Sequence, residues 1–326
     1  MKFRKFSDLG WNVSEIGLGC WAIGSEWGDV AEEDAREVLK TSLDNGINFF
    51  DTADVYGDGR SEKFIGELIK STSAKIYVTT KSGRRLNPHS AQGYNLKNIE
   101  GFVDRSLVNL GVECIDLLQL HCPPSEICPK KETFEMMDEI VNKGKIGNYG
   151  VSVEKVSEAM DAIQFPNVKS IQIIFNIFRQ KPSEIFFKEA EKNNVAIIAR
   201  VPLASGMLTG KMNNKSVFPE NDHRNYNING DAFDVGETFS GVNFEKGLKA
   251  VEKLKKLLPS NFTLTDLALK WILMHKEVSV VIPGAKNKNQ VQNNVLASEK
   301  EEISDIVNKI NSIYNDMIKS EVNDRW

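Results

Sequence analysis

Eight short apolar runs recur along the 326-residue chain, separated by stretches with the apolar spacing of helices. The runs begin at Ile16, Ile47, Ile76, Ile115, Ile146, Ser170, Ala196 and Val278. Strands that alternate with amphipathic helices are typical of a parallel sheet covered by helices. Eight such pairs, with no linker of different composition between two halves, favour a closed (β/α)₈ TIM barrel over a doubly wound open sheet. We therefore predict an α/β fold with one domain over residues 1–326.

Further elements are expected before, after and between these pairs. A hairpin of residues 2–6 and 13–16 precedes the first helix, and an extra amphipathic helix over 303–313 follows the last strand and helix. The helix after the second run is expected to open at Ser61. Residues 211–243 are rich in Asn, Asp and Gly. Such a long irregular stretch in a compact domain is usually a lid or a disordered excursion.

The charge balance argues against nucleic acid or an anionic membrane as a partner. The chain has 41 basic and 45 acidic residues and a net charge of -4, and no apolar run reaches the ~20 residues that a membrane-spanning helix needs. The N-terminus lacks the apolar core of a signal peptide, so we expect a cytoplasmic protein. Nothing in the sequence specifies an oligomeric state. Four cysteines are expected to be free thiols: Cys20, Cys114, Cys122 and Cys128.

Polar residues end several of the predicted strands, at the edge where the catalytic groups of such barrels lie. Asp51, Lys81 and His121 end the second, third and fourth strands, and Tyr56 lies just beyond Asp51. Each has a structural interpretation by itself, as a helix cap, a solvated strand end, an interior histidine or a packed aromatic. Four such groups at one edge would be costly to desolvate unless they pair, and arrangements of this kind cluster at active sites.

The four residue types suit proton donation to a carbonyl oxygen. A tyrosine hydroxyl with its ordinary pKa near ~10 is a poor acid, and a nearby ammonium lowers that pKa by stabilising the phenolate. Lys81 can supply the ammonium, and Asp51 can hold it in place. His121 can then orient a carbonyl oxygen beside the Tyr56 hydroxyl.

A metal site is a rival interpretation of the same edge. His121, Cys122 and Cys128 could ligate zinc in principle. The chain has only four histidines, and it lacks the paired-histidine motif of metal-dependent barrel hydrolases. We therefore expect no metal.

Five segments resemble the sequence blocks of the aldo-keto reductases, in the order of that family. They are DTADVYGDGRSE at 51–62, VTTKSG at 78–83, LLQLHCPP at 117–124, GVS at 150–152 and PLASGMLTGK at 202–211. The resemblance covers nearly the whole chain. It implies an NAD(P)H-dependent oxidoreductase with a catalytic tetrad, in which Tyr56 is the general acid: Asp51, Tyr56, Lys81 and His121.

The resemblance also implies a nicotinamide cofactor held without a Rossmann fingerprint, which this sequence lacks. Ser152 and Gln172 would bind the nicotinamide carboxamide, and Arg200 would lie against the ring. The pyrophosphate would be lined by Leu203, Ser205, Gly206 and Leu208. The remaining cofactor-binding candidates, mostly for the adenosine end, are Lys211, Gly284, Lys286, Gln290 and Asn294.

Three positions depart from the family pattern. Arg200 stands where many relatives have a tyrosine, and its charge is expected to disfavour the oxidised nicotinamide ring relative to the reduced one. Val153 replaces an asparagine, which removes one carboxamide ligand. Lys286 replaces an arginine, but with Lys288 it still offers two positive charges to a ribose 2′-phosphate. We therefore expect NADPH as the cofactor, with NADH less favoured.

The expected reaction is NADPH-dependent reduction of an aldehyde or ketone, with hydride from nicotinamide C4 and a proton from Tyr56. Trp21 and Trp27 follow the first strand and favour an apolar or aromatic carbonyl substrate. Some relatives in this family are regulatory subunits of potassium channels and keep the tetrad. A non-catalytic, nicotinamide-binding regulatory module is therefore the alternative function.

Overall fold

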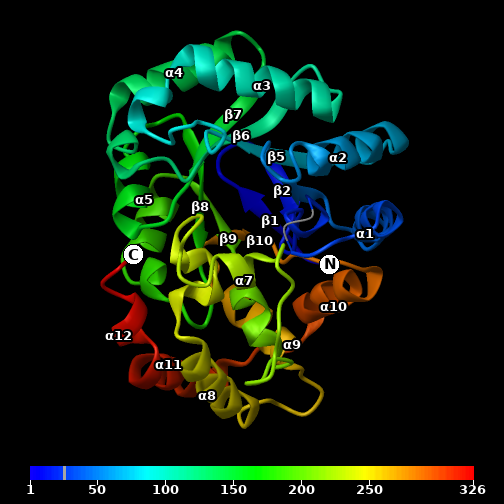
Figure 1. Ribbon diagram of the computed structural model, residues 1–326, viewed down its shortest axis with the longest axis vertical. Coiled ribbons are helices and arrows are strands. Elements are labelled where there is room, and N and C mark those ends of the chain that lie inside the picture. The colour runs from blue at the N-terminus through cyan, green and yellow to red at the C-terminus, as the bar shows by residue number, and fades with distance from the viewer. Residues whose placement is uncertain (25–26) are drawn as a thin grey trace.

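The computed structural model describes residues 1–24 and 27–326. Its centre is a parallel eight-stranded sheet whose strands follow one another in chain order (Figure 1). The strands are β3 (Leu18–Gly19), β4 (Phe49–Asp51), β5 (Tyr77–Ser82), β6 (Ile115–His121), β7 (Ile146–Ser152), β8 (Val168–Ile174), β9 (Ala196–Arg200) and β10 (Val278–Val281). Parallel bridges from Ile16 to Val281 and from Gly19 to Gly284 join the two edges of this sheet. The predicted (β/α)₈ barrel is confirmed.

Helices alternate with these strands and surround the barrel (Figure 1). In chain order they are α1 (Glu32–Asp44), α2 (Arg60–Ser71), α3 (Leu96–Leu110), α4 (Lys131–Asn142), α5 (Val156–Ala162), α6 (Phe186–Lys192), α9 (Leu264–Leu273) and α10 (Lys288–Glu299). In α3 the Asn95 side chain caps the amide of Asn98, and Gly111 ends the helix at φ 66°. Ile99 and Val103 face the core, four residues apart, as the apolar spacing requires.

The N-terminal hairpin closes one end of the barrel. It consists of β1 (Phe3–Phe6) and β2 (Trp11–Ser14), so its second strand begins two residues earlier than predicted, directly after the turn at Gly10. Phe6 and Val13 pack against residues at the amino ends of the strands, including Phe49. The polar strand ends therefore lie at the opposite, open end of the barrel.

Helix α2 begins one residue before Ser61. Gly59 is its N-cap residue at φ 90°, a backbone conformation that favours glycine. The Ser61 hydroxyl is instead buried, where it accepts a hydrogen bond from Thr52 at 2.8 Å and donates one to the Cys20 carbonyl at 3.0 Å. The predicted start of α2 at Ser61 was therefore wrong by one residue. The Ser61 hydroxyl does not cap the helix but bonds it to the barrel.

The long stretch 211–243 packs on the open end of the barrel. It contains α7 (His223–Tyr226) and the short 3-10 helices η6 (Val235–Glu237) and η7 (Phe239–Gly241). Asp222, His223, Glu237 and Ser240 are buried within it. Such burial suits a covering segment and not a disordered excursion.

The last helices lie outside the barrel. The sequence analysis did not predict α8 (Phe244–Lys255), which Asn243 caps and which buries Val251 and Leu254. It packs against α11 (Ser304–Met317), the predicted extra helix, and α12 (Lys319–Val322) follows. Across 1–24 and 27–326, none of the helices has the length and apolar character that crossing a membrane requires.

Candidate active site

The barrel brings the four predicted catalytic residues together at its open end. Asp51 and His121 end β4 and β6, Lys81 lies in β5, and Tyr56 follows β4. The Lys81 ammonium donates to Asp51 Oδ1 at 2.6 Å, to the Thr52 carbonyl at 2.8 Å and to the Tyr56 hydroxyl at 3.4 Å. The Tyr56 and His121 rings meet edge to face with centroids 5.9 Å apart. These contacts link a tyrosine hydroxyl to a buried cation and a carboxylate.

Close backbone packing fixes the loop that carries Tyr56. Gly24 lies so near that a Cβ added there would stand 2.9 Å from the Tyr56 Cβ, and Gly57 takes a φ of 58° against the same turn. Both glycines therefore permit an approach that larger residues would block. The Trp21 ring stacks on the Tyr56 ring with centroids 5.9 Å apart, and both residues line the cavity described below.

Burial governs the ionisation of the groups around Tyr56. It raises the pKa of Asp51, and the hydrogen bonds from Lys81 and Gln172 oppose that rise. Burial also holds the pKa of His121 well below its ordinary value, with help from the positive charges of Arg84 and Lys81. His121 is therefore a neutral imidazole near pH ~7 and can donate one hydrogen bond.

Gln172 makes a contact that was not predicted from the sequence. Its amide nitrogen donates to Asp51 Oδ2 at 2.7 Å, so it completes the hydrogen bonding of the carboxylate that holds Lys81. Ser152, the other predicted carboxamide ligand, lies with its hydroxyl oxygen 3.7 Å from the Cys122 sulfur. Both residues still line the cavity described next.

A cavity of about 1090 Å³ extends from Tyr56 and His121 across the carboxyl end of the barrel. Most predicted cofactor residues line it: Ser152, Gln172, Arg200, Leu203, Ser205, Gly206, Lys211, Gly284, Lys286, Gln290 and Asn294. Trp21 and Trp27 line it too, with the His223 ring packed against both at centroid distances of 4.7 and 4.3 Å. Leu208 is not part of this wall, because its side chain is buried in the hydrophobic core.

The predicted pyrophosphate segment is strained and tied to the covering stretch. Within η5 (Ala204–Thr209), Ser205 and Gly206 take φ values of 54° and 90°. The Ser205 hydroxyl donates to the Glu237 carbonyl and accepts from the Phe239 amide, both at 3.0 Å. The serine side chain thus anchors residues 237–239, while the backbone at Gly206 faces the cavity without a Cβ.

The two lysines predicted for the 2′-phosphate lie in different places. Lys286 lines the cavity, and its ammonium donates to the Trp27 carbonyl. Lys288 is half exposed and pairs with Glu37 at 2.9 Å. Arg224, which the sequence analysis missed, lines the same end of the cavity, with its guanidinium 5.0 Å from the Trp27 ring centre.

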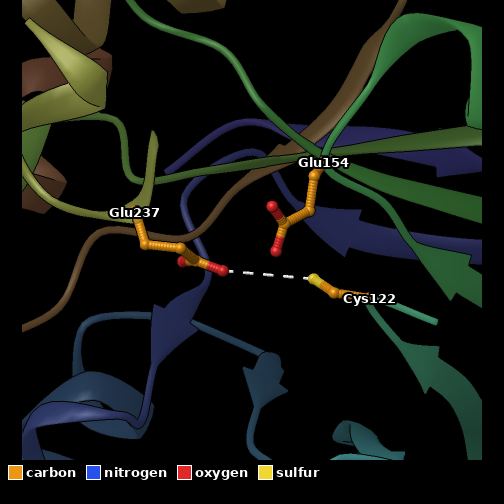
Figure 2. A group of neighbouring side chains, drawn as sticks. All are labelled: Cys122, Glu154 and Glu237. Carbon is orange, nitrogen blue, oxygen red and sulfur yellow. Dashed lines mark hydrogen bonds between the residues drawn. The ribbon is translucent and has the colours of Figure 1, made fainter. Parts of the chain in front are cut away.

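A buried charge cluster beside the tetrad was also missed. Arg84 pairs with Glu154 and with Glu237 at 3.0 Å each, and Arg200 pairs with Glu237 at 2.6 Å. Glu237 also approaches the Cys122 sulfur at 4.0 Å (Figure 2). These five residues come from five separate loops and strand ends, so no local spacing in the sequence relates them.

Ligand atoms of Cys122, Glu154 and Glu237 lie within 4.8 Å of one another and could in principle hold a metal ion (Figure 2). This group differs from the combination of Cys122 with His121 and Cys128 that was considered from the sequence and rejected. Both carboxylates already pair with arginines. Burial also raises the pKa of the Cys122 thiol to about 11, so the sulfur carries its proton. A metal ion bound here would have to displace the arginines from the two carboxylates and the proton from the thiol.

The residues that line the cavity fit a dinucleotide cofactor. The cavity runs from the tetrad, past the glycine backbone at Gly206, to a cationic end at Lys286. Among the described residues, His121 Nδ1 and Arg200 Nε are buried polar atoms without a hydrogen-bond partner.

Comparison with known proteins agrees with this arrangement. The model of the aldo/keto reductase family matches residues 15–315. The chain belongs to the aldo/keto reductase family. Members of this family are oxidoreductases, so the protein is one as well.

Three relatives show how far the likeness extends. An aldo-keto reductase of Schizosaccharomyces pombe whose name includes NADP(+), yakc, is 30% identical over 86% of this chain and 83% of its own. A probable voltage-gated potassium channel subunit beta of Arabidopsis thaliana is 29% identical over 91% of both chains. The holo structure of the aldo-keto reductase AKR11C1 of Bacillus halodurans has a TM-score of 0.76, 28% identity and coverage of 100% and 99%.

Proposed function

We propose that this aldo/keto reductase uses NADPH to reduce a small aldehyde or ketone to an alcohol, with Tyr56 as the proton donor. The observation that carries the proposal is the contact of the Tyr56 hydroxyl with the Lys81 ammonium at 3.4 Å, beside the neutral His121. A positive charge at this distance stabilises the phenolate that proton donation leaves behind.

Each residue has a separate part in the reaction. Bound NADPH supplies the hydride for the carbonyl carbon. Tyr56 gives its proton to the carbonyl oxygen as negative charge develops there, and Lys81 stabilises the resulting phenolate. His121 donates a hydrogen bond that orients the same oxygen. Asp51, held by Gln172, keeps the Lys81 ammonium aimed at Tyr56.

NADPH is proposed over NADH because of the cationic end of the cavity. Lys286 comes from the segment after β10, and Arg224, which pairs with Asp222 at 2.6 Å, comes from the covering stretch, so two basic side chains of different origin line this end. A ribose 2′-phosphate carries up to two negative charges and gains from both. The NADP(+) in the name of the S. pombe relative agrees with this choice.

The substrate is proposed to be a small carbonyl compound that contacts both aromatic and charged groups. Trp21 and Trp27 offer apolar surface, as expected from the sequence. Arg84 and Glu154 line the same cavity and offer a hydrogen-bond donor and an acceptor. A substrate in this cavity would therefore contact charged groups as well as the two tryptophans.

The proposal is tested by the loss of NADPH absorbance on mixing the purified protein with aromatic aldehydes, α-dicarbonyls and cyclic ketones, with NADH in parallel. Turnover with NADPH that is lost in Tyr56→Phe supports it. Tight binding of NADPH without turnover of any compound would favour the second candidate, a regulatory module, to which the likeness to a channel beta subunit points. Absence of cofactor binding would contradict both.

A further inference from the structure

A buried ion pair connects the covering stretch to the end of β9. The Arg200 Nη1 atom lies 2.6 Å from Glu237 Oε2, and each side chain is 7% exposed. Arg200 also donates to the Val153 carbonyl at 2.9 Å, so its guanidinium is fixed from two sides. The second Glu237 oxygen accepts from Arg84 at 3.0 Å. Glu237 thus sits between two arginines in the wall of the cavity.

Both members of the pair carry their charge. Burial opposes ionisation of Glu237, but Arg200 and Arg84 outweigh it and lower the pKa of this carboxyl group. Burial likewise opposes the charge on Arg200, but Glu237 together with Cys122 and Glu154 outweighs it, so the pKa of the guanidinium is raised. Arg200 and Glu237 together are therefore neutral, although each is an ion.

Several contacts place Glu237 before any ligand binds. Its carbonyl accepts from the Ser205 hydroxyl at 3.0 Å. Asp234, three residues earlier in the chain, accepts a hydrogen bond from the Trp326 indole at 2.9 Å. The Arg179 guanidinium lies 4.0 Å from the centre of the same indole ring. These anchors hold the segment through groups other than the Glu237 carboxylate. Replacing that carboxylate by an amide therefore preserves most of what positions residue 237.

We propose that Glu237 is a specificity-determining residue that sets the balance between oxidised and reduced cofactor. The inference rests on the proposed function and on the expectation from the family resemblance that Arg200 lies against the nicotinamide ring. The oxidised ring is cationic and the reduced ring is neutral. An uncompensated guanidinium would repel the oxidised ring alone, whereas the Arg200–Glu237 pair presents no net charge to it. Glu237, which Arg200 shares with Arg84, thereby weakens the charge effect expected from Arg200 in the sequence, so that both NADP⁺ and NADPH are expected to bind.

The test is the ratio of the dissociation constants of NADP⁺ and NADPH, measured by equilibrium titration of the purified protein. Glu237→Gln leaves Arg200 uncompensated and is expected to raise this ratio by about tenfold or more, since unit charges a few ångströms apart inside a protein interact strongly. Arg200→Met leaves the negative charge of the Glu237 carboxylate without the Arg200 guanidinium, and it is expected to lower this ratio. The double variant, which has neither charge, is expected to return close to the parent.

Glu154→Gln is the matched control. Glu154 pairs with Arg84, and in the described part of the chain no ion pair joins it to Arg200. Burial raises the pKa of Glu154 to about 8, so the control loses little charge near pH ~7 and is expected to keep the parent ratio.

Equal weakening of both cofactors in Glu237→Gln would overturn the inference, because it would reduce Glu237 to an anchor of the covering stretch. A double variant that keeps the ratio of Glu237→Gln would overturn it as well. If Glu237→Gln does not fold, Arg200→Met and the double variant still give the comparison, and equal ratios in these two would contradict the role of Glu237. A parent protein that binds neither cofactor would contradict the proposed function itself.

Discussion

The Lys81 ammonium lies 3.4 Å from the Tyr56 hydroxyl, on a side chain that is only 1% exposed. Water therefore screens this contact weakly, and the electrostatic effect of the ammonium on the hydroxyl is larger than at a protein surface. The same ammonium is held by Asp51, so the position of the positive charge is fixed before a substrate arrives.

Replacing Tyr56 by phenylalanine removes the proposed proton donor and little else. We expect kcat to fall by ~10² to 10⁴, which is the usual contribution of a positioned acid. The Kd of NADPH, measured by fluorescence titration, is expected to stay near the parent value. A variant with the parent kcat would exclude Tyr56 as the donor.

Lys81→Met leaves the Asp51 carboxylate buried without its cation. We expect the free energy of unfolding to fall by ~3 to 5 kcal/mol, as is found when one partner of a buried pair is removed. The double variant Lys81→Met/Asp51→Asn is expected to be more stable than Lys81→Met, because it buries no lone charge. Urea unfolding of the three proteins measures this, and equal losses in both variants would show that the pair is not coupled.

His121 is expected to remain neutral from about pH 6 to 8, because burial and nearby positive charges hold its pKa well below the ordinary value. NMR of protein with labelled histidines checks this directly. The signals of His121, assigned with a His121→Gln variant, should not shift across this range. Titration near pH ~6.5 would contradict the neutral hydrogen-bond donor proposed for this position.

Matched substitutions of Lys286 and Lys288 test which lysine favours NADPH over NADH. Lys286→Met removes a cavity charge and is expected to raise KM for NADPH by about tenfold, with little effect on NADH. Lys288→Met removes an exposed charge that pairs with Glu37, and KM for NADPH is expected to stay within about twofold. Similar effects of the two substitutions would argue against a phosphate contact by Lys286.

Asp54 is expected to make stability depend on pH. Its side chain is buried, both carboxylate oxygens lack a partner among the described residues, and burial together with Glu62 raises its pKa to about 7. Between about pH 4 and 7 the folded protein holds this proton and the unfolded chain does not.

The free energy of unfolding therefore contains a contribution that decreases as the pH rises through this window, by at most ~1.4 kcal/mol per unit. Asp54→Asn removes this contribution, so the stability difference between the parent and the variant should change with pH in urea titrations from about pH 5 to 8. A constant difference would show that Asp54 does not titrate as expected.

The sequence by itself determined the barrel and the gathering of the tetrad. Parallel strands that alternate with helices place all carboxyl ends at one edge, so Asp51, Lys81 and His121 had to meet there. The apolar period and the caps also located most helices. Helix α8 was not predicted from the sequence, although its buried residues Gly247, Ala250, Val251 and Leu254 follow the apolar spacing of a helix.

Only the tertiary structure decided what each polar group pairs with. The Gln172 amide donates a hydrogen bond to Asp51, and Glu237 pairs with Arg200 and Arg84, which lie 37 and 153 residues away in the chain. Periodicity reports which side of an element is buried, but it carries no information on partners brought together by folding. The energy of an ion depends on its burial and on the charges within a few ångströms, and both are set by the packing of distant segments.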